Sequence, residues 1–387
     1  MKKLLSLMLV LAAIISIASC SKKEAETSAE VSESQELRIA MITDSSDITD
    51  QGFNQITYET CKNFAGQYSL GFQYYKPSGD TREARVASIN QAIQDGYNVI
   101  VVPGYLFAES IFQVAEMNSD VYFVGLDISE GDVLAVAETA GKSNWKLPPN
   151  CFCAVYEEHL SGFMAGYAAV KEGYKHLGFL GGIAVPPVTR FGFGFVQGAD
   201  AAAKEMGIAD QVAVEYIYGG QFYGDSIITA AMDSWYQQRG VEAIFACGGG
   251  IFTSACEAAA KVGKKVIGVD VDQTVQINKY GEGMHLTSAM KGLAATVTTV
   301  LTALYNDQWN RYSGKFESLG LTSPEVDDPN SPNFVQLPTE HWAMTNFTFD
   351  DYKALVADLY NGKYVVSNKT DAMPATEITV NQYPNIK

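Results

Sequence analysis

The chain alternates short runs of strand-forming residues with longer amphipathic stretches. We expect a first series of strands at 37–43, 70–75, 98–102, 121–126, 133–138 and 151–155, and a second at 176–180, 212–218, 242–246 and 265–269. Helical patterns fill most of the intervals, for example 83–95, 160–171 and 254–262. This alternation is typical of βαβ units, whose parallel sheets carry helices on both faces. It predicts an α/β chain.

The number of strands is too large for one ordinary sheet, so we expect two doubly wound lobes. The first crossing between them is expected near residues 150–158. We assign 37–155 and about 286–320 to the first lobe, and about 156–285 and 321–387 to the second. The last part of the chain is less regular, with a strand-like run at 342–349 and a helical pattern at 350–359.

The N-terminal residues have the pattern of a targeting signal. Met1-Lys2-Lys3 is cationic, and the apolar stretch 4–17 is too short for a typical membrane span. Small residues then precede Cys20, as in a bacterial lipobox, which predicts a signal peptide at 1–19 and a lipidated Cys20. Residues 20–36 are then the lipidated cysteine and a polar, flexible tether. A plain secretion signal with an incidental cysteine is the alternative.

Charge and cysteine content narrow the possible partners. The formal net charge is −17, and no basic patch is present, which argues against a nucleic-acid ligand. Five cysteines remain after Cys20, without the spacing of a disulfide framework or a zinc site. We interpret them as small core residues.

Three predicted strands end in aspartate. Asp44 follows 37–43, Asp127 follows 121–126, and Asp270 follows 265–269, with Asp272 two residues further. Ligands of open α/β sheets bind outside the carboxyl ends of the strands, so these carboxylates are candidates for one site. A strand-end aspartate also commonly caps the next helix, which is the alternative for each of them.

The neighbouring side chains indicate what such a site binds. A carboxylate accepts hydrogen bonds, as from a vicinal diol, whereas Phe53 offers a flat apolar face and Asn54 both a donor and an acceptor for the edge of a base. A diol with a base is a nucleoside. Phe222, after 212–218, is a candidate second aromatic, and Phe191 competes with it. Ordinary core packing remains the alternative for Phe53.

Two further positions complete the candidate set. Gly248 follows 242–246 and would let backbone N–H groups approach a ligand, although the phosphate-binding G-x-G-x-x-G spacing is absent. Lys291 follows a run at 286–290 and could donate to a sugar oxygen. A solvated surface lysine is the alternative there.

Several segments resemble the basic membrane protein family, the purine nucleoside-binding lipoproteins of ABC importers. The similarity covers about residues 37–310 and rests on the stretches 44–55, 178–182, 186–191, 267–273 and 286–291. It implies a type I periplasmic-binding-protein fold of two three-layer lobes with a hinge, which close on the ligand. Glycines 248–250 are followed here by Ile251-Phe252-Thr253, where family members usually have Thr and further Gly.

The resemblance also implies roles for individual residues. Phe53 and Phe222 would sandwich the base. Asn54 and Asp127 would contact its edge, with Asp44 a further candidate, and Asp270 and Lys291 would bind the ribose. The implied protein is no enzyme, uses no cofactor, and is an envelope lipoprotein, expected to be monomeric, that passes purine nucleosides of the inosine, guanosine or adenosine type to an ABC permease.

Three other functions fit parts of the sequence. A sugar or furanose-signal binding protein of the same fold would also use carboxylates and aromatics. A nucleoside hydrolase would need a denser acidic cluster than Asp270-x-Asp272, and the four histidines lack metal-binding spacing. A surface adhesin would leave the strand-end aspartates unexplained.

Overall fold

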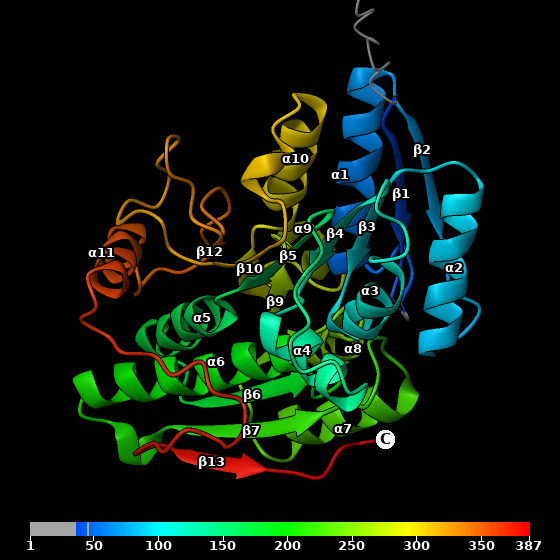
Figure 1. Ribbon diagram of the computed structural model, residues 1–387. Coiled ribbons are helices and arrows are strands. Elements are labelled where there is room, and N and C mark those ends of the chain that lie inside the picture. The colour runs from blue at the N-terminus through cyan, green and yellow to red at the C-terminus, as the bar shows by residue number, and fades with distance from the viewer. Residues whose placement is uncertain (1–35, 45) are drawn as a thin grey trace, which may run out of the picture. The chain divides into compact units, whose positions relative to one another are not determined.

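Two β-sheets organise the chain (Figure 1). The computed structural model describes residues 36–44 and 46–387, so the predicted signal peptide, Cys20 and the tether up to residue 35 lie outside the described residues. In the first sheet, every neighbouring pair is parallel. Its strand order is β11 (Lys315–Leu319), β5 (Cys151–Tyr156), β4 (Tyr122–Leu126), β3 (Val99–Pro103), β1 (Arg38–Ile42) and β2 (Gly71–Tyr75).

The second sheet is also parallel, except where its first strand pairs antiparallel with its neighbour. Its order is β12 (Val335–Gln336), β10 (His285–Lys291), β9 (Lys265–Asp270), β8 (Ala243–Cys247), β6 (His176–Gly181), β7 (Ala213–Tyr218) and β13 (Thr379–Gln382). The predicted α/β class with two doubly wound lobes is therefore confirmed.

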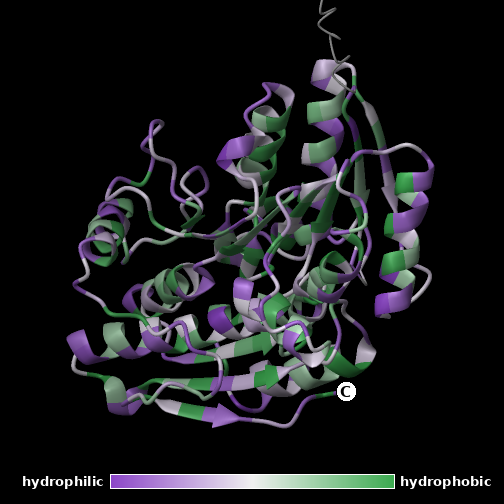
Figure 2. Cartoon of the chain, viewed as in Figure 1, coloured by the Kyte–Doolittle hydropathy of each residue, from purple (hydrophilic) through white to green (hydrophobic). Residues whose placement is uncertain are grey.

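Helices connect most of the strands, as the alternation predicted. They are α1 (Phe53–Tyr68), α2 (Arg82–Gln94), α3 (Ala108–Val114), α4 (Glu130–Thr139), α5 (Glu158–Glu172), α6 (Pro186–Glu205), α7 (Ser226–Gln237), α8 (Phe252–Ala260), α9 (Thr274–Asn278), α10 (Leu293–Tyr305) and α11 (Phe349–Tyr360). The central strands are mainly hydrophobic and buried, whereas helices such as α2 mix hydrophobic and hydrophilic residues (Figure 2).

The connections between the two sheets are hydrogen-bonded to one another. Glu157 N–H donates to the carbonyl of Leu319 at 3.0 Å, Gly292 N–H to Phe334 at 2.8 Å, and Phe334 N–H to Gly320 at 2.9 Å. The chain thus crosses between the sheets after β5, β10 and β11 at one place, as a hinge requires. Strand β10 pairs with β9 in the second sheet, although the boundary expected near residue 286 would put it in the first.

Two predicted strands are wrong. Residues 133–138 belong to α4, because Ser129 and Asp132 form a capping box that starts a helix, and Val133 and Ala137 are buried on one helical face. Residues 342–349 form no strand, because the N–H groups of residues 345–347 donate to the Glu172 carboxylate instead of to a neighbouring strand. The helix expected at 350–359 is confirmed as α11.

Helices α5 and α6 lie side by side on the second sheet and pack backbone against backbone (Figure 1). A Cβ atom on Gly162 would lie 2.2 Å from the carbonyl oxygen of Phe191, and one on Gly198 would lie 1.9 Å from that of Phe163. No larger residue fits at such contacts without moving a helix. The close glycine contacts therefore fix the position of α5 relative to α6. The first residues of both helices lie near the site described below.

Candidate ligand-binding site

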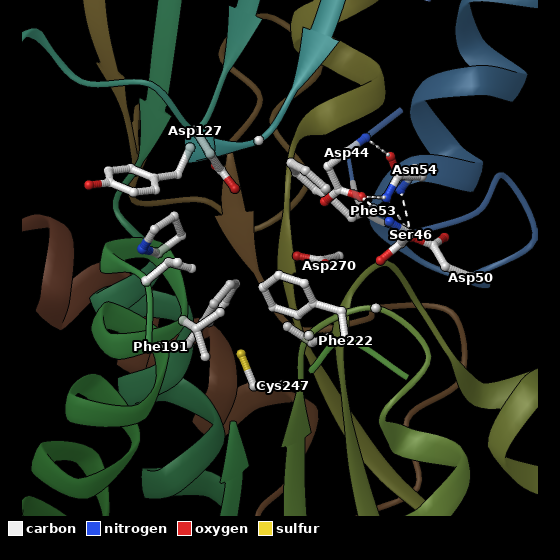
Figure 3. Close-up of a pocket in the computed structure, with 18 of the residues that line it drawn as sticks. Asp44, Ser46, Asp50, Phe53, Asn54, Asp127, Phe191, Phe222, Cys247 and Asp270 are labelled. Atoms are coloured by element: carbon white, nitrogen blue, oxygen red, sulfur yellow. Dashed lines mark hydrogen bonds between the residues drawn. The ribbon is translucent and has the colours of Figure 1, made fainter. Parts of the chain in front are cut away.

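One cavity lies at the carboxyl ends of strands from both sheets (Figure 3). The space inside it, with the open solvent at its mouth included, is about 570 Å³. All the ligand-binding candidates predicted from the sequence line it: Asp44, Phe53, Asn54, Asp127, Phe222, Gly248, Asp270 and Lys291. Residues up to 247 positions apart in the sequence, from 44 to 291, thus line one cavity, as expected for side chains at the carboxyl ends of strands.

Lys291 is the centre of a buried charge cluster. Its Nζ lies 2.5 Å from Asp127 Oδ2, 3.5 Å from Asp270 Oδ1 and 3.7 Å from Glu158 Oε1. All of these side chains are almost inaccessible to solvent. Arg190 Nε in turn donates to Glu158 Oε2 at 2.6 Å. The lysine is therefore no surface residue, and it compensates carboxylates from both sheets.

The pKa values follow from burial. Desolvation raises the pKa of Asp127 to about 6 against the opposing effect of Lys291, and it raises the pKa of Asp270 to about 6 in the same way. Burial alone would lower the pKa of Lys291, but Asp127, Asp270 and Glu158 outweigh it and raise that pKa. At neutral pH the lysine is charged, and both aspartates are mainly ionised.

Two of these aspartates have unusual backbones. Asp127 has a φ of 59° and Asp270 a φ of 66°, in the left-handed region that residues other than glycine rarely adopt. Asp127 Oδ1 is also buried without a hydrogen-bond partner in the described part of the chain. Strained backbone and an unpaired buried oxygen both concentrate at functional sites. Asp127 Oδ1 therefore has the capacity to accept a further hydrogen bond.

Asp44 and Asn54 are hydrogen-bonded to each other at the edge of the cavity. The Asn54 amide donates to Asp44 Oδ1 at 2.9 Å and to Asp50 Oδ2 at 3.0 Å, and its oxygen accepts from Asp44 N–H. Both of its donors are therefore used inside the protein. Asp44 lines the cavity, and its Oδ2 accepts no hydrogen bond within the described residues. Desolvation raises the pKa of Asp44 to about 6.

Aromatic side chains enter the cavity from both lobes. Phe53 begins α1, and Lys291 Nζ lies 4.6 Å from the centre of its ring. Phe222 follows β7 and packs against the backbone of Gly182 and Gly248, where an added Cβ would lie 2.4 Å and 2.9 Å from its ring. Phe191, on α6, lines the cavity as well, so the two candidates for a second aromatic are both present.

Gln273 joins the two lobes beside the cavity. This fully buried side chain accepts from Val269 N–H and donates from Nε2 to the carbonyl of Gln51 at 3.0 Å. Gln51, with a φ of 57°, lies in the loop before Phe53. The contact therefore connects the loop after β9 in one lobe with the start of α1 in the other.

Several residues of the site were not predicted. Asp50 receives four hydrogen bonds that hold the start of α1, Glu158 lies next to Lys291, and Arg190 pairs with Glu158. The capping position of Asp50, shortly before a helix, was an available signal. Asp272 does not line the cavity, because Oδ1 accepts from Thr274 and Oδ2 lies 2.9 Å from His341 Nδ1.

Three further features of the described residues concern their cysteines, metal binding and membrane spans. The cysteines in the described part are free and buried, as expected for core residues. In residues 36–44 and 46–387, no group of three or more His, Cys, Asp and Glu could hold a metal ion. Over the same residues, no helix combines the length and apolarity needed to cross a bilayer.

Two doubly wound lobes with a shared cavity at their strand ends define the type I periplasmic-binding-protein fold. Solved structures agree with this fold. An ABC transporter solute-binding protein from Aeropyrum pernix K1 superposes with a TM-score of 0.69 at 17% identity, over 87% of this chain and 95% of that one. An ABC transporter solute-binding protein from Conexibacter woesei DSM 14684 superposes with a TM-score of 0.62 at 21% identity, over 86% of this chain and 99% of that one.

The chain belongs to the family of PnrA-like ABC transporter substrate-binding proteins, whose model matches residues 37–338. It is 27% identical over 290 residues to the ABC transporter nucleoside-binding protein BmpA of Lactococcus lactis subsp. cremoris, covering 70% of this chain and 74% of the relative. It is 24% identical over 311 residues to basic membrane protein B of Borreliella burgdorferi, covering 78% and 84%. The resemblance noted in the sequence is confirmed, and the family is one of substrate-binding proteins rather than enzymes.

Proposed function

We propose that this substrate-binding protein captures purine nucleosides and delivers them to an ABC permease. The observation that carries the proposal is the composition of the cavity, where buried hydrogen-bond acceptors lie beside aromatic rings. A nucleoside supplies the matching parts, a flat base and a ribose with vicinal hydroxyls. The nucleoside-binding BmpA relative supports the same ligand class.

The contacts suggest how the ligand is held. Phe53 and Phe222 stack on the two faces of the base, and Asp270 with Lys291 binds the ribose hydroxyls. Asp127 Oδ1 and Asp44 Oδ2 accept N–H groups from the base edge, since neither oxygen has a donor in the described protein. Asn54 keeps Asp44 in place and is not itself a base contact. Carboxylate acceptors that face N1 favour inosine and guanosine, whose N1 carries a hydrogen, over adenosine, whose N1 is itself an acceptor.

Calorimetric titration tests this assignment. Residues 24–387, which include the whole unit 37–387, are titrated with inosine, guanosine, adenosine, uridine and D-ribose. We expect the two 6-oxopurine nucleosides to bind most tightly, and Phe53→Leu to weaken them about tenfold, since an aromatic contact contributes about 0.5–1.5 kcal/mol beyond its area. Phe72→Leu, at the far edge strand β2, is the matched control. Tight binding of ribose alone would point to a sugar-binding protein, and conversion of inosine to free base would point to a hydrolase.

We also propose that Cys20 carries the lipid anchor and that the protein acts as a monomer on the outer side of a membrane. More than one acyl chain on Cys20 would be needed for stable anchoring. Metabolic labelling with a radioactive fatty acid should label the native protein, and Cys20→Ser should abolish the label. Labelling that persists in this variant would refute the anchor.

A further inference from the structure

The C-terminal segment beyond the family match runs along the second lobe. The family model ends at residue 338, and the chain continues through α11 to strand β13, which lies at the edge of the second sheet (Figure 1). Strand β13 pairs parallel with β7, from Thr379 opposite Ala213 to Gln382 opposite Tyr216. This part of the chain is therefore built into the lobe that supplies Phe222.

Beyond β13 the chain keeps following β7 toward the cavity. Tyr383 N–H donates to the carbonyl of Tyr216 at 3.0 Å, and Ile386 N–H donates to that of Tyr218 at 2.9 Å. The Tyr383 hydroxyl also donates to Glu215 Oε2 and accepts from Arg239. These bonds hold residues 383–387 beside the end of β7, directly before the loop that carries Phe222.

Lys387 contacts this loop itself. Its Nζ donates to Gln221 Oε1 at 3.0 Å and forms an ion pair with Asp225. Its carbonyl oxygen lies so close to Gly220 that an added Cβ there would be 2.7 Å away, and Gly220 has a φ of 85°. Gln221 and Asp225 are themselves hydrogen-bonded at 3.1 Å. Lys387 thus contacts residues that come before Phe222 in the sequence, Gly220 and Gln221, and one that comes after it, Asp225.

The loops after β6 and β8 hold the other side of this loop. Phe222 accepts a hydrogen bond from Gly250 N–H at 2.8 Å, and Gly219 and Gly220 donate to Gly181 and Gly182 at 2.7 Å and 2.9 Å. The loop that carries Phe222 is therefore bonded to the glycine loops and, through its neighbouring residues, to residues 383–387. A side chain ordered before binding costs less conformational entropy when the ligand arrives.

We propose that residues 383–387 form a brace that positions Phe222 for the ligand, with Lys387 as its positioning residue. The brace would make residues outside the family match part of the binding machinery. The inference rests on the proposed function only in taking Phe222 as a ligand contact.

Two measurements on residues 24–387 test the brace. Lys387→Ala and removal of residues 383–387 are compared with Lys369→Ala, which removes the same charge from an exposed position of the same segment. In the ligand-free protein, we expect hydrogen exchange of the amides at 219–224 to rise about tenfold in both brace variants, with β1 and β3 unchanged, since such openings are local. In titrations with inosine and guanosine, we expect affinity to fall about tenfold in both brace variants only.

The outcomes separate the two proposals. Unchanged exchange at 219–224 in Lys387→Ala would overturn the brace, whatever the ligand. Raised exchange with unchanged nucleoside affinity would overturn its positioning role. A native protein that binds neither nucleoside would contradict the proposed function, and raised exchange in that case would still support the brace. If the chain without residues 383–387 fails to fold, the Lys387→Ala variant alone tests the brace in both measurements.

Discussion

Lys291, at the end of a strand of the second sheet, places its ammonium nitrogen 2.5 Å from a carboxylate oxygen of Asp127, which follows a strand of the first sheet. The contact crosses the cavity between the lobes, and both groups are buried. An ion pair in this place links the lobes through two residues that line the cavity. Folding and binding therefore depend on one charge cluster.

Replacing Lys291 by methionine should destabilise the protein by about 3–5 kcal/mol at pH 7, because buried carboxylates would lose their counter-charge. Lysine lowers the pKa of Asp127 and Asp270, so without it both folded-state values rise further above their unfolded value. A raised carboxyl pKa means that the folded state binds more protons than the unfolded state. The loss of stability caused by the substitution should therefore become smaller as the pH falls from 7 to 5.

Urea unfolding at both pH values measures this effect. Lys261→Met is the matched control, since Lys261 is an exposed lysine paired with Asp233 and should cost less than about 1 kcal/mol. Equal losses in the two variants would show that the buried cluster contributes no more than a surface pair.

Ligand affinity should fall in acid. Burial raises the pKa of Asp44, Asp127 and Asp270 to about 6, and their roles as acceptors require the ionised form. Binding must then remove any proton that they carry, so the affinity is constant above pH 7 and weakens below pH about 6. Calorimetry in buffers of different ionisation enthalpy should detect proton release near pH 6. Affinity that stays constant or rises down to pH 5 would contradict these roles.

Gln273→Ala should speed up ligand dissociation by about threefold to tenfold, because the variant loses a hydrogen bond between the lobes, and a typical one contributes about 0.5–1.5 kcal/mol. Stopped-flow fluorescence after mixing the complex with a competitor measures the rate. Gln238→Ala, whose side chain bonds only within its own helix end, is the control. Identical dissociation rates in the two variants would argue that Gln273 does not stabilise the closed form.

Gly198→Ala should cost at least about 3 kcal/mol of unfolding free energy, since its Cβ would lie 1.9 Å from the carbonyl oxygen of Phe163 and would force two packed helices apart. The matched control is Gly66→Ala in α1, where an added Cβ meets nothing within 4 Å. That control should be neutral or stabilising, because alanine favours a helix interior over glycine by about 0.5–1 kcal/mol. Thermal unfolding of both variants distinguishes the two sites.

The parallel sheets and the cavity-lining residues were predictable because both depend on local pattern. Aspartates end the apolar runs of β1, β4 and β9. Parallel strands bring such ends to one edge of each sheet, and both edges face the same cavity, which is how Asp44 and Asp270 meet there. The capping box at Ser129 was equally local, but it was outweighed by the apolar run that follows, so α4 was predicted as a strand.

Features that depend on the third dimension were not predictable. Glu158 meets Arg190 because glycine contacts bring α5 and α6 together, and only the folded chain places Glu158 beside Lys291. Asn54 has the chemistry of a base contact, but the positions of Asp44 and Asp50 use both of its donors. Strand β13 pairs with β7, which is far away in sequence. Apolar and polar residues alternate too weakly in β13 for a strand to be predicted there.

The central claim is that the cavity holds a purine nucleoside. It is tested most directly by purifying residues 24–387 without added ligand, denaturing the protein, and identifying the released small molecules by mass spectrometry, since a closed cleft can retain its ligand. We expect a purine nucleoside in up to stoichiometric amount, and the emptied and refolded protein should rebind it. Release of a sugar, or an empty protein that no nucleoside stabilises against heat, would contradict the claim.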